Sequence, residues 1–89
     1  MVTVWIPALL RDLTQGKEQV KIQASTIKEV IDNLNALYPG FKDRLFKEDK
    51  LRSDITILID GEVTYDRLRQ KVFDNNEVFF VPTMAGGSY

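Results

Sequence analysis

Apolar and polar side chains alternate through the first residues of the chain. Residues 2–6 carry valine or isoleucine at every second position, a period that is typical of a strand with one buried face. Pro7 ends this strand, and Val20 and Ile22 repeat the alternation after the turn sequence 14–17. Two strands joined by a short connection predict an antiparallel hairpin.

The segment Thr26–Tyr38 has the period of an amphipathic helix. Its apolar residues recur at spacings of three and four, which places them on one stripe that we expect to face a sheet. Thr26 and Glu29 match a capping box, in which each side chain accepts a backbone N–H at the start of the helix. Pro39 and Gly40 then end the helix. The expected stripe consists of Ile27, Val30, Ile31, Leu34, Leu37 and Tyr38.

Two connecting segments have weaker patterns. Residues 8–13 fit either a turn of helix or an uneven continuation of the first strand. Phe41, Leu45 and Phe46 are spaced to cover one edge of the core through a short helical turn. The charged stretch 47–54 is interpreted as a solvated loop of mixed charge, with a functional loop as the less favoured alternative.

The last third of the chain predicts three more strands. Residues 55–59 are rich in β-branched side chains and apolar enough to form a central strand. Asp60 and Gly61 form a hairpin-turn dipeptide that leads into a short strand over 62–65. The remaining elements are a helical turn over 66–71 with Leu68 facing inward, a turn at 74–76 and a last strand over 77–81.

This order of elements predicts an α+β fold. A helix between strands of one sheet crosses over a single face, so the sheet and the helix form two layers. We expect a mixed sheet of four to five strands with one main helix packed on one face. Residues 78–81 are too apolar for a fully exposed edge strand, and the C-terminal tail follows them directly.

The composition excludes several kinds of site. The chain has the length of one domain, and it contains no cysteine and no histidine. Disulfides, thiolate zinc sites, cysteine-held iron–sulfur clusters and histidine general bases are therefore excluded, and we expect no metal site. The net charge of −1 gives no general basic field for nucleic acid or an anionic membrane. Because no spanning segment or signal peptide is visible, we expect a cytoplasmic protein without a membrane partner.

The C-terminal tail is the main functional candidate. We divide the chain into a domain over residues 1–82 and a flexible tail over 83–89, because Pro82 resists continuing a central strand. Gly86 and Gly87 carry no side chain, so their backbone is thin. Residues 83–87 reach roughly 17 Å when extended, enough to enter a deep, narrow active site on another protein. The alternative is an ordinary frayed end, in which glycine and serine are common.

The order and spacing of several short motifs resemble those of a known family, the ubiquitin-like sulfur carriers, which includes the molybdopterin-synthase small subunit and the thiamin-pathway carrier. The resemblance covers most of the chain and implies the β-grasp fold. One difference is the turn at 74–76, where asparagine stands in place of a glycine and tolerates positive φ nearly as well. The motifs are Leu10-Arg11, the Thr26-led helix closing at Tyr38-Pro39, Ile59-Asp60-Gly61-Glu62-Val63, Glu77-Val78 leading to Val81-Pro82, and Ala85-Gly86-Gly87.

The resemblance implies a chemistry for the tail. An E1-like partner enzyme would adenylate the Gly87 carboxylate with ATP, and a sulfur source would then displace AMP to leave a thiocarboxylate. Gly86 would supply clearance for the nucleotide and the attacking sulfur. The chain itself would bind no cofactor and carry no catalytic residue, since it would be a consumable co-substrate of a sulfur-accepting biosynthetic enzyme.

A second difference from the family affects this chemistry. Most carriers end at the second glycine, whereas this chain continues with Ser88 and Tyr89. The resemblance to carriers with short extensions implies a proprotein, cut between Gly87 and Ser88 by a JAMM-type zinc metalloprotease. Such carriers supply sulfur for cysteine, methionine or sulfur-bearing siderophores, and molybdopterin synthesis is the second choice of pathway.

Two other functions stay open on the sequence. The chain could be a ubiquitin-like protein modifier joined to lysines through its glycine, or a non-catalytic β-grasp interaction module. For the sulfur carrier as for these alternatives, a partner-docking surface is expected on the sheet face away from the helix, because the strands carry apolar residues on both sides. Alternation places Trp5, Leu58 and Phe79 on that face. The alternative is that loops cover these three side chains.

Overall fold

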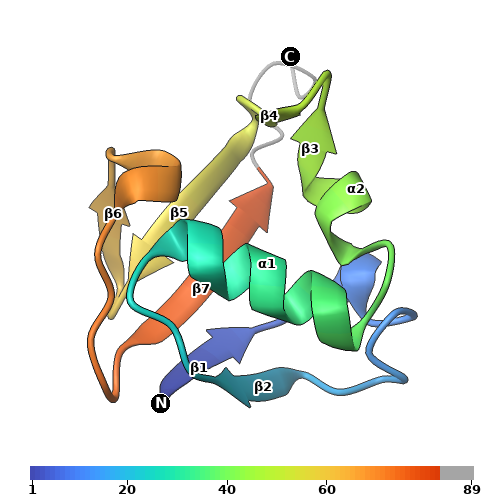
Figure 1. Cartoon of the computed structure of the whole chain (residues 1–89), viewed down its shortest axis with the longest axis horizontal. Helices are drawn as coiled ribbons and strands as arrows, with labels where there is room; N and C mark the ends of the chain where they lie inside the picture. The colour runs from blue at the N-terminus through green and yellow to red at the C-terminus, as the bar shows by residue number, and fades with distance from the viewer. Residues whose placement is uncertain (83–89) are drawn as a thin grey trace.

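A five-stranded mixed sheet forms the centre of the molecule (Figure 1). The computed structural model describes residues 1–82, and the strands lie in the order β2-β1-β7-β5-β6. The last strand is therefore central, which confirms the expectation that it is not an exposed edge strand. It pairs parallel with β1 and antiparallel with β5. The strands are β1 (Val2–Trp5), β2 (Gln19–Ile22), β5 (Ile55–Ile59), β6 (Glu62–Thr64) and β7 (Glu77–Pro82).

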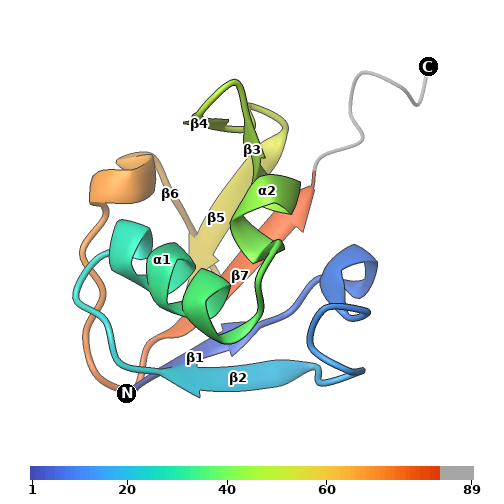
Figure 2. The ribbon, with the colours of Figure 1, turned by 45° about the vertical axis from the view of Figure 1, so that its right-hand side comes forward.

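Helix α1 (Ile27–Leu37) lies across one face of the sheet (Figure 2). Its N-cap is Thr26, whose hydroxyl oxygen accepts a hydrogen bond from the Glu29 backbone N–H at 3.2 Å. The capping box is only half formed, because the Glu29 carboxylate accepts from the backbone N–H and hydroxyl of Ser25 instead of from Thr26. Those hydrogen bonds lower the pKa of Glu29, and the bond from the Ser25 backbone N–H makes the largest contribution.

The apolar stripe of α1 meets the sheet, with one exception. Ile27, Val30, Ile31 and Leu34 are buried, and Tyr38 is partly buried against them. The prediction for Leu37 was wrong, since this side chain is 59% exposed at the end of the helix. The facing layer consists of Val2, Val4, Val20, Ile22, Ile55, Ile57, Val78 and Phe80.

Short elements close the edges of the core. The 3-10 helix η1 (Ala8–Leu10) follows β1, and α2 (Phe41–Leu45) confirms the expected helical turn, with Phe41 and Leu45 buried. The interpretation of residues 47–54 as a loop was incomplete, because β3 (Phe46–Lys47) and β4 (Lys50–Leu51) pair there as a hairpin. Its two turn residues have positive φ, a feature without a strong sequence signal in Glu48-Asp49.

The end of the sheet opposite Pro82 is held by turns with polar contacts. Asp60 and Gly61 both have positive φ, which is the conformation that a two-residue hairpin requires. The Asp60 carboxylate accepts from the backbone N–H of Glu77 and from the side-chain amide of Asn76. Asn75 has φ of 73°, as expected from the tolerance of asparagine for this region. The 3-10 helix η2 (Arg67–Arg69) lies between these turns in the sequence.

The fold class confirms the prediction of an α+β structure with one main helix on one face. The buried side chains form a single cluster between α1, α2 and one face of the sheet. Within residues 1–82, no helix is both long and apolar enough to cross a membrane.

Candidate functional site

The central strand β7 leads directly to the predicted tail. Pro82 is the last described residue, and it lies opposite Ile55 in the antiparallel pairing of β7 with β5. All five residues of β5 therefore pair with β7, up to the last described residue before the tail. The predicted reactive residues Gly86, Gly87 and Ser88 lie outside the described residues, as does the boundary proposed for the tail.

The three predicted docking residues lie side by side on the sheet. The register places Trp5 opposite Phe79, Phe79 opposite Leu58, and Leu58 opposite Val63, so one row of side chains crosses four strands. Each of the first three is partly exposed, and Val63 is 47% exposed. Sequence reasoning did not include Val63, because only the pairing of β5 with β6 brings it into the row. We call Trp5, Leu58, Val63 and Phe79 the outer row.

The two aromatic rings of the outer row are stacked. The centroids of Trp5 and Phe79 are 5.6 Å apart and the ring planes differ by 4°, an offset arrangement that aromatic pairs favour. The indole N–H of Trp5 donates to the Glu77 carboxylate at 2.8 Å. The pair is therefore held in one orientation while one face stays accessible to a partner.

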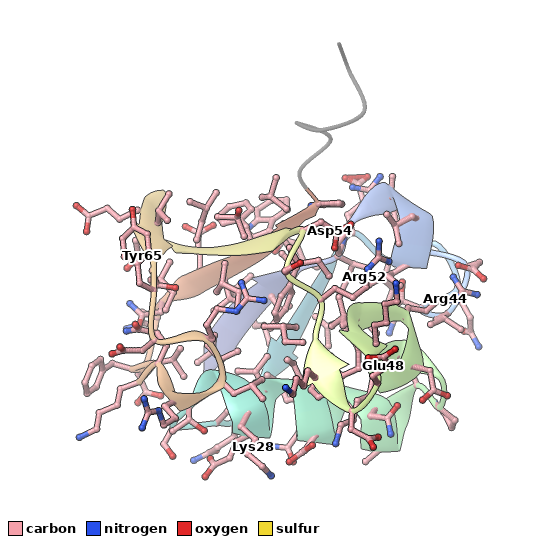
Figure 3. All side chains as sticks on the ribbon, turned by 90° about the horizontal axis from the view of Figure 1, so that it is seen from above. Lys28, Arg44, Glu48, Arg52, Asp54 and Tyr65 are labelled. Atoms are coloured by element: carbon pink, nitrogen blue, oxygen red, sulfur yellow. The ribbon has the colours of Figure 1, made fainter. Side chains whose placement is uncertain are left out.

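Two ion pairs flank the end of β7. Arg44 bonds both carboxylate oxygens of Asp12, and Arg52 bonds both of Asp54, with shortest distances of 2.9 and 2.6 Å. In each case hydrogen bonding from the guanidinium lowers the pKa of the partner carboxyl. Figure 3 shows Arg44, Arg52 and Asp54 together on one side of the molecule, far from Tyr65.

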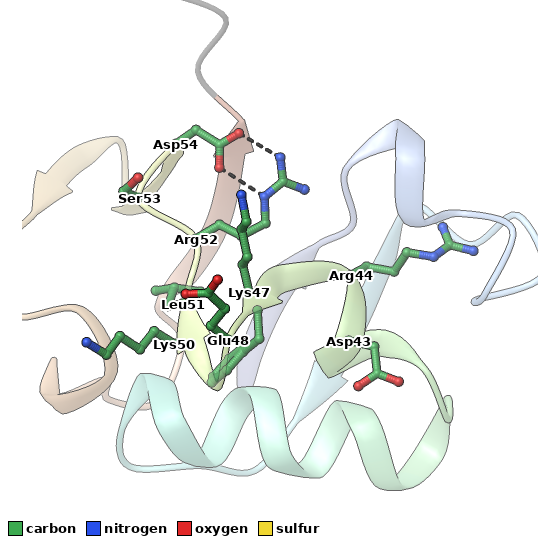
Figure 4. A pocket seen from close by; sticks show the side chains of 10 residues that line it. Asp43, Arg44, Lys47, Glu48, Lys50, Leu51, Arg52, Ser53 and Asp54 are labelled. Atoms are coloured by element: carbon green, nitrogen blue, oxygen red, sulfur yellow. Dashed lines mark hydrogen bonds and ion pairs between the residues drawn. The ribbon is translucent and has the colours of Figure 1, made fainter.

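Next to these pairs the β3–β4 hairpin borders an open hollow of about 950 Å³ (Figure 4). Its charged lining residues are of both signs, and Figure 4 shows the side chains of Arg52 and Asp54 turned toward each other. In residues 1–82, no three acidic, histidine or cysteine side chains are grouped so that they would hold a metal ion. The described surface thus offers contact faces, and the chemistry predicted for this chain rests on the tail.

A scan against protein-family models matches the ThiS family over residues 4–87. Among curated proteins, the sulfur carrier protein CysO of Mycobacterium tuberculosis H37Rv is 34% identical, and the match covers 97% of this chain and 98% of that protein. The same values hold for CysO of Mycobacterium bovis. The match extends over both predicted parts of the chain, the domain and the tail up to Gly87.

Solved structures give the same result for the fold. A chain in the Amycolatopsis orientalis BexX/CysO complex superposes with a TM-score of 0.86 at 33% identity, covering 93% of this chain and 96% of that one. Mycobacterium tuberculosis CysO has a TM-score of 0.86 at 31% identity, with 93% and 99% covered. Small archaeal modifier protein 1 of Methanosarcina acetivorans superposes with a TM-score of 0.81 at 25% identity, covering 97% of this chain and 95% of that one. The chain therefore belongs to the ThiS family, with a ubiquitin-like β-grasp fold, and is a homologue of the sulfur carrier CysO.

Proposed function

We propose that this chain carries sulfur as a thiocarboxylate on Gly87, after Ser88 and Tyr89 have been removed. One observation carries the proposal: in a homologue of CysO, a central strand leads to Pro82, and the sequence then reaches a diglycine at residues 86 and 87. In the sequence Gly87 is followed by Ser88, so the Gly87 carbonyl is part of an amide bond. Cleavage after Gly87 supplies the carboxylate that the chemistry needs.

The reaction has two steps on the partner enzymes. A Gly87 carboxylate oxygen attacks the α-phosphorus of ATP and pyrophosphate leaves, which turns a poor electrophile into an acyl adenylate. A sulfur nucleophile then attacks the carbonyl carbon, and the bond to AMP breaks. The chain is a co-substrate in both steps, and Gly86 leaves room on the approach to the carbonyl.

The proposed partners follow from these steps. They are an E1-like adenylating enzyme, a JAMM-type zinc metalloprotease for the bond between Gly87 and Ser88, and a biosynthetic enzyme that accepts the sulfur. Cysteine, methionine or a sulfur-bearing siderophore is the preferred product, and molybdopterin is the second choice. In this proposal ATP and the sulfur source bind to the partners, and the reaction takes place in the cytoplasm.

The deciding experiment compares ATP–pyrophosphate exchange by the cognate activating enzyme with three chains: full length, ending at Gly87, and ending at Gly87 with Gly87→Ala. We expect exchange only from the second. Tyr89 places the terminal carboxylate about 7 Å beyond the glycine position, and far smaller misplacements cost about a hundredfold in rate. Equal exchange by the full-length and shortened chains would refute the proprotein.

We propose that the outer row docks the activating enzyme. Its support is the partly exposed stacked pair of Trp5 and Phe79, which lies on the sheet face away from α1 (Figure 2). Phe79→Ser is expected to weaken binding about tenfold or more, as loss of a central aromatic contact does. The matched control is Phe73→Ser, since Phe73 is 68% exposed in the turn before β7. Equal affinities of the folded variants would remove the outer row from the interface.

A second candidate function is protein modification, favoured by the similarity to small archaeal modifier protein 1 at 25% identity. In that case Gly87 forms isopeptide bonds with lysines. Mass spectrometry of the protein from its native host separates the two. Oxygen-to-sulfur replacement on a chain ending at Gly87 supports the carrier, and ladders of conjugates support the modifier. Only unmodified full-length chains would leave an interaction module.

A further inference from the structure

A small apolar cavity lies at the root of the tail. Its volume is about 130 Å³, and seven of its ten lining residues are apolar. We call it the socket. It is bounded by η1, α2, the start of β5 and the end of β7. The lining residues are Pro7, Leu9, Leu10, Arg44, Leu45, Arg52, Asp54, Ile55, Phe80 and Pro82.

The socket and the outer row lie on opposite sides of the sheet. Phe80 lines the socket while the neighbouring Phe79 belongs to the outer row, and successive side chains of a strand point to opposite faces. The socket is therefore a separate surface feature, and an observation about one does not depend on the other. Pro82, the last described residue before the tail, forms part of the socket wall.

We propose that the socket receives a large aliphatic or aromatic side chain from the activating enzyme. This inference rests on the proposed function, since it requires an enzyme that takes Gly87 into its active site. From Pro82 to Gly87 the chain spans at most roughly 17 Å. An active site below the enzyme surface therefore brings that surface against the residues around Pro82, and the socket is among them.

The chemistry of the lining selects the occupant. The guanidiniums of Arg44 and Arg52 at the rim are already paired with Asp12 and Asp54. A polar or charged occupant would compete with these pairs, whereas an apolar one leaves them intact and removes apolar surface from water. An apolar protein cavity of about 150 Å³ binds benzene, so the socket is of the right size for one leucine, methionine or phenylalanine side chain.

Leu9 provides the test, because it lines the socket and is 50% exposed, so its replacement leaves the core in place. Leu9→Lys puts an ammonium at the apolar mouth, and Leu37→Lys is the matched control on an exposed leucine of α1. Calorimetry of the chain ending at Gly87 with the activating enzyme is expected to show about tenfold weaker binding for Leu9→Lys alone. Equal affinity of the two variants would overturn the proposal.

Kinetics separate the socket from the proposed function. Leu9→Lys is expected to raise KM of pyrophosphate exchange with kcat unchanged, since it removes binding that is equal in ground and transition states. If the chain ending at Gly87 binds but never supports exchange, the proposed function fails while the calorimetric result for the socket still stands. A fall in kcat with unchanged KM and affinity would overturn the socket proposal.

Methyl NMR signals of Leu10, Leu45 and Ile55, which line the socket, distinguish three occupants: the enzyme, the chain's own tail and a second copy of the chain. Shifts that appear on adding the enzyme, and that added benzene prevents, support the proposal. Shifts that differ between the full-length and shortened chains without enzyme would mean that the chain's own tail fills the socket. Shifts that change on dilution would mean a second copy does. Either of the last two results would overturn the enzyme as occupant.

Discussion

Phe79 and Phe80 are neighbours on the same central strand, and they have opposite environments. Phe80 is 3% exposed beneath the helices, while Phe79 is partly exposed and stacked on Trp5. Strand β1 repeats the contrast with Val4, which is fully buried, and Trp5. Both faces of the sheet are apolar at these positions, but within residues 1–82 only one has a second layer.

The contrast separates stability from recognition. Burial behind α1 and α2 explains the apolar residues of the covered face. The apolar residues of the open face leave part of their surface in water, so fold stability alone accounts for them less well. The two faces should therefore respond differently to the same substitution.

The largest difference is expected between Phe80→Ala and Phe79→Ala. Truncating a buried phenylalanine costs about 3–5 kcal/mol of unfolding free energy, because it removes buried surface and leaves a cavity. Loss of the stacked pair on the open face costs about 0.5–1.5 kcal/mol beyond the lost area. Urea unfolding followed by circular dichroism measures both. Equal losses would mean that the two faces contribute alike to stability.

Helix α1, which covers one face of the sheet, can be destabilised at its N-cap. Thr26→Ala removes the oxygen that accepts the Glu29 N–H, so the unfolding free energy should fall by about 1 kcal/mol. Thr26→Ser keeps the oxygen and serves as the control. Binding through the outer row should be unchanged in a folded Thr26→Ala protein. A parallel loss of affinity would show that the open face depends on the helix.

Low pH is expected to reduce the stability of the N-terminal end of α1. Hydrogen bonds from Ser25 hold the pKa of Glu29 below its unfolded value of about 4.3, so folding favours the carboxylate form. The resulting stabilisation is present above pH of about 4.3 and is lost as the pH falls through the lower folded pKa. Unfolding at a series of pH values should show a weaker acid dependence for Glu29→Gln than for the parent chain. Identical slopes would contradict this role.

The smallest effect is expected at Glu77. Glu77→Ala removes the acceptor of the Trp5 indole N–H on the exposed face, which should change the unfolding free energy by less than about 0.5 kcal/mol. The indole N–H signal in NMR should nevertheless shift, because its hydrogen bond to protein is replaced by one to water. A large loss of stability would give the open face a structural role that its exposure does not suggest.

Local periodicity predicted the parts of the fold that have a clear buried face. The alternation at β1 and β2 and the stripe of α1 led to the correct elements, and the turn at Asp60-Gly61 was correct as well. The β3–β4 hairpin was missed because its strands have two residues each and no repeating pattern. Leu37 was misplaced because spacing alone did not distinguish it from Tyr38, which packs against the core while Leu37 is exposed in the last turn of α1.

The candidate site likewise has parts that local patterns predicted and parts that they did not. Alternation was enough to group Trp5, Leu58 and Phe79, but Val63 joins them only through strand pairing. The socket has no local signature, since its walls come from four separate segments of the chain. Features assembled from distant segments depend on the tertiary fold, which single-sequence patterns do not contain.

The central place of β7 has a consequence for how the molecule assembles. Trp5 and Glu77 are joined across 72 positions of sequence, and β7 alone connects the β1–β2 hairpin to the β5–β6 hairpin. During synthesis from the N-terminus, four strands of the sheet are made before the one that unites them. The complete five-stranded sheet can therefore form only after β7 has been synthesised, and such long-range pairing is expected to make folding slower than in a fold with mainly local contacts.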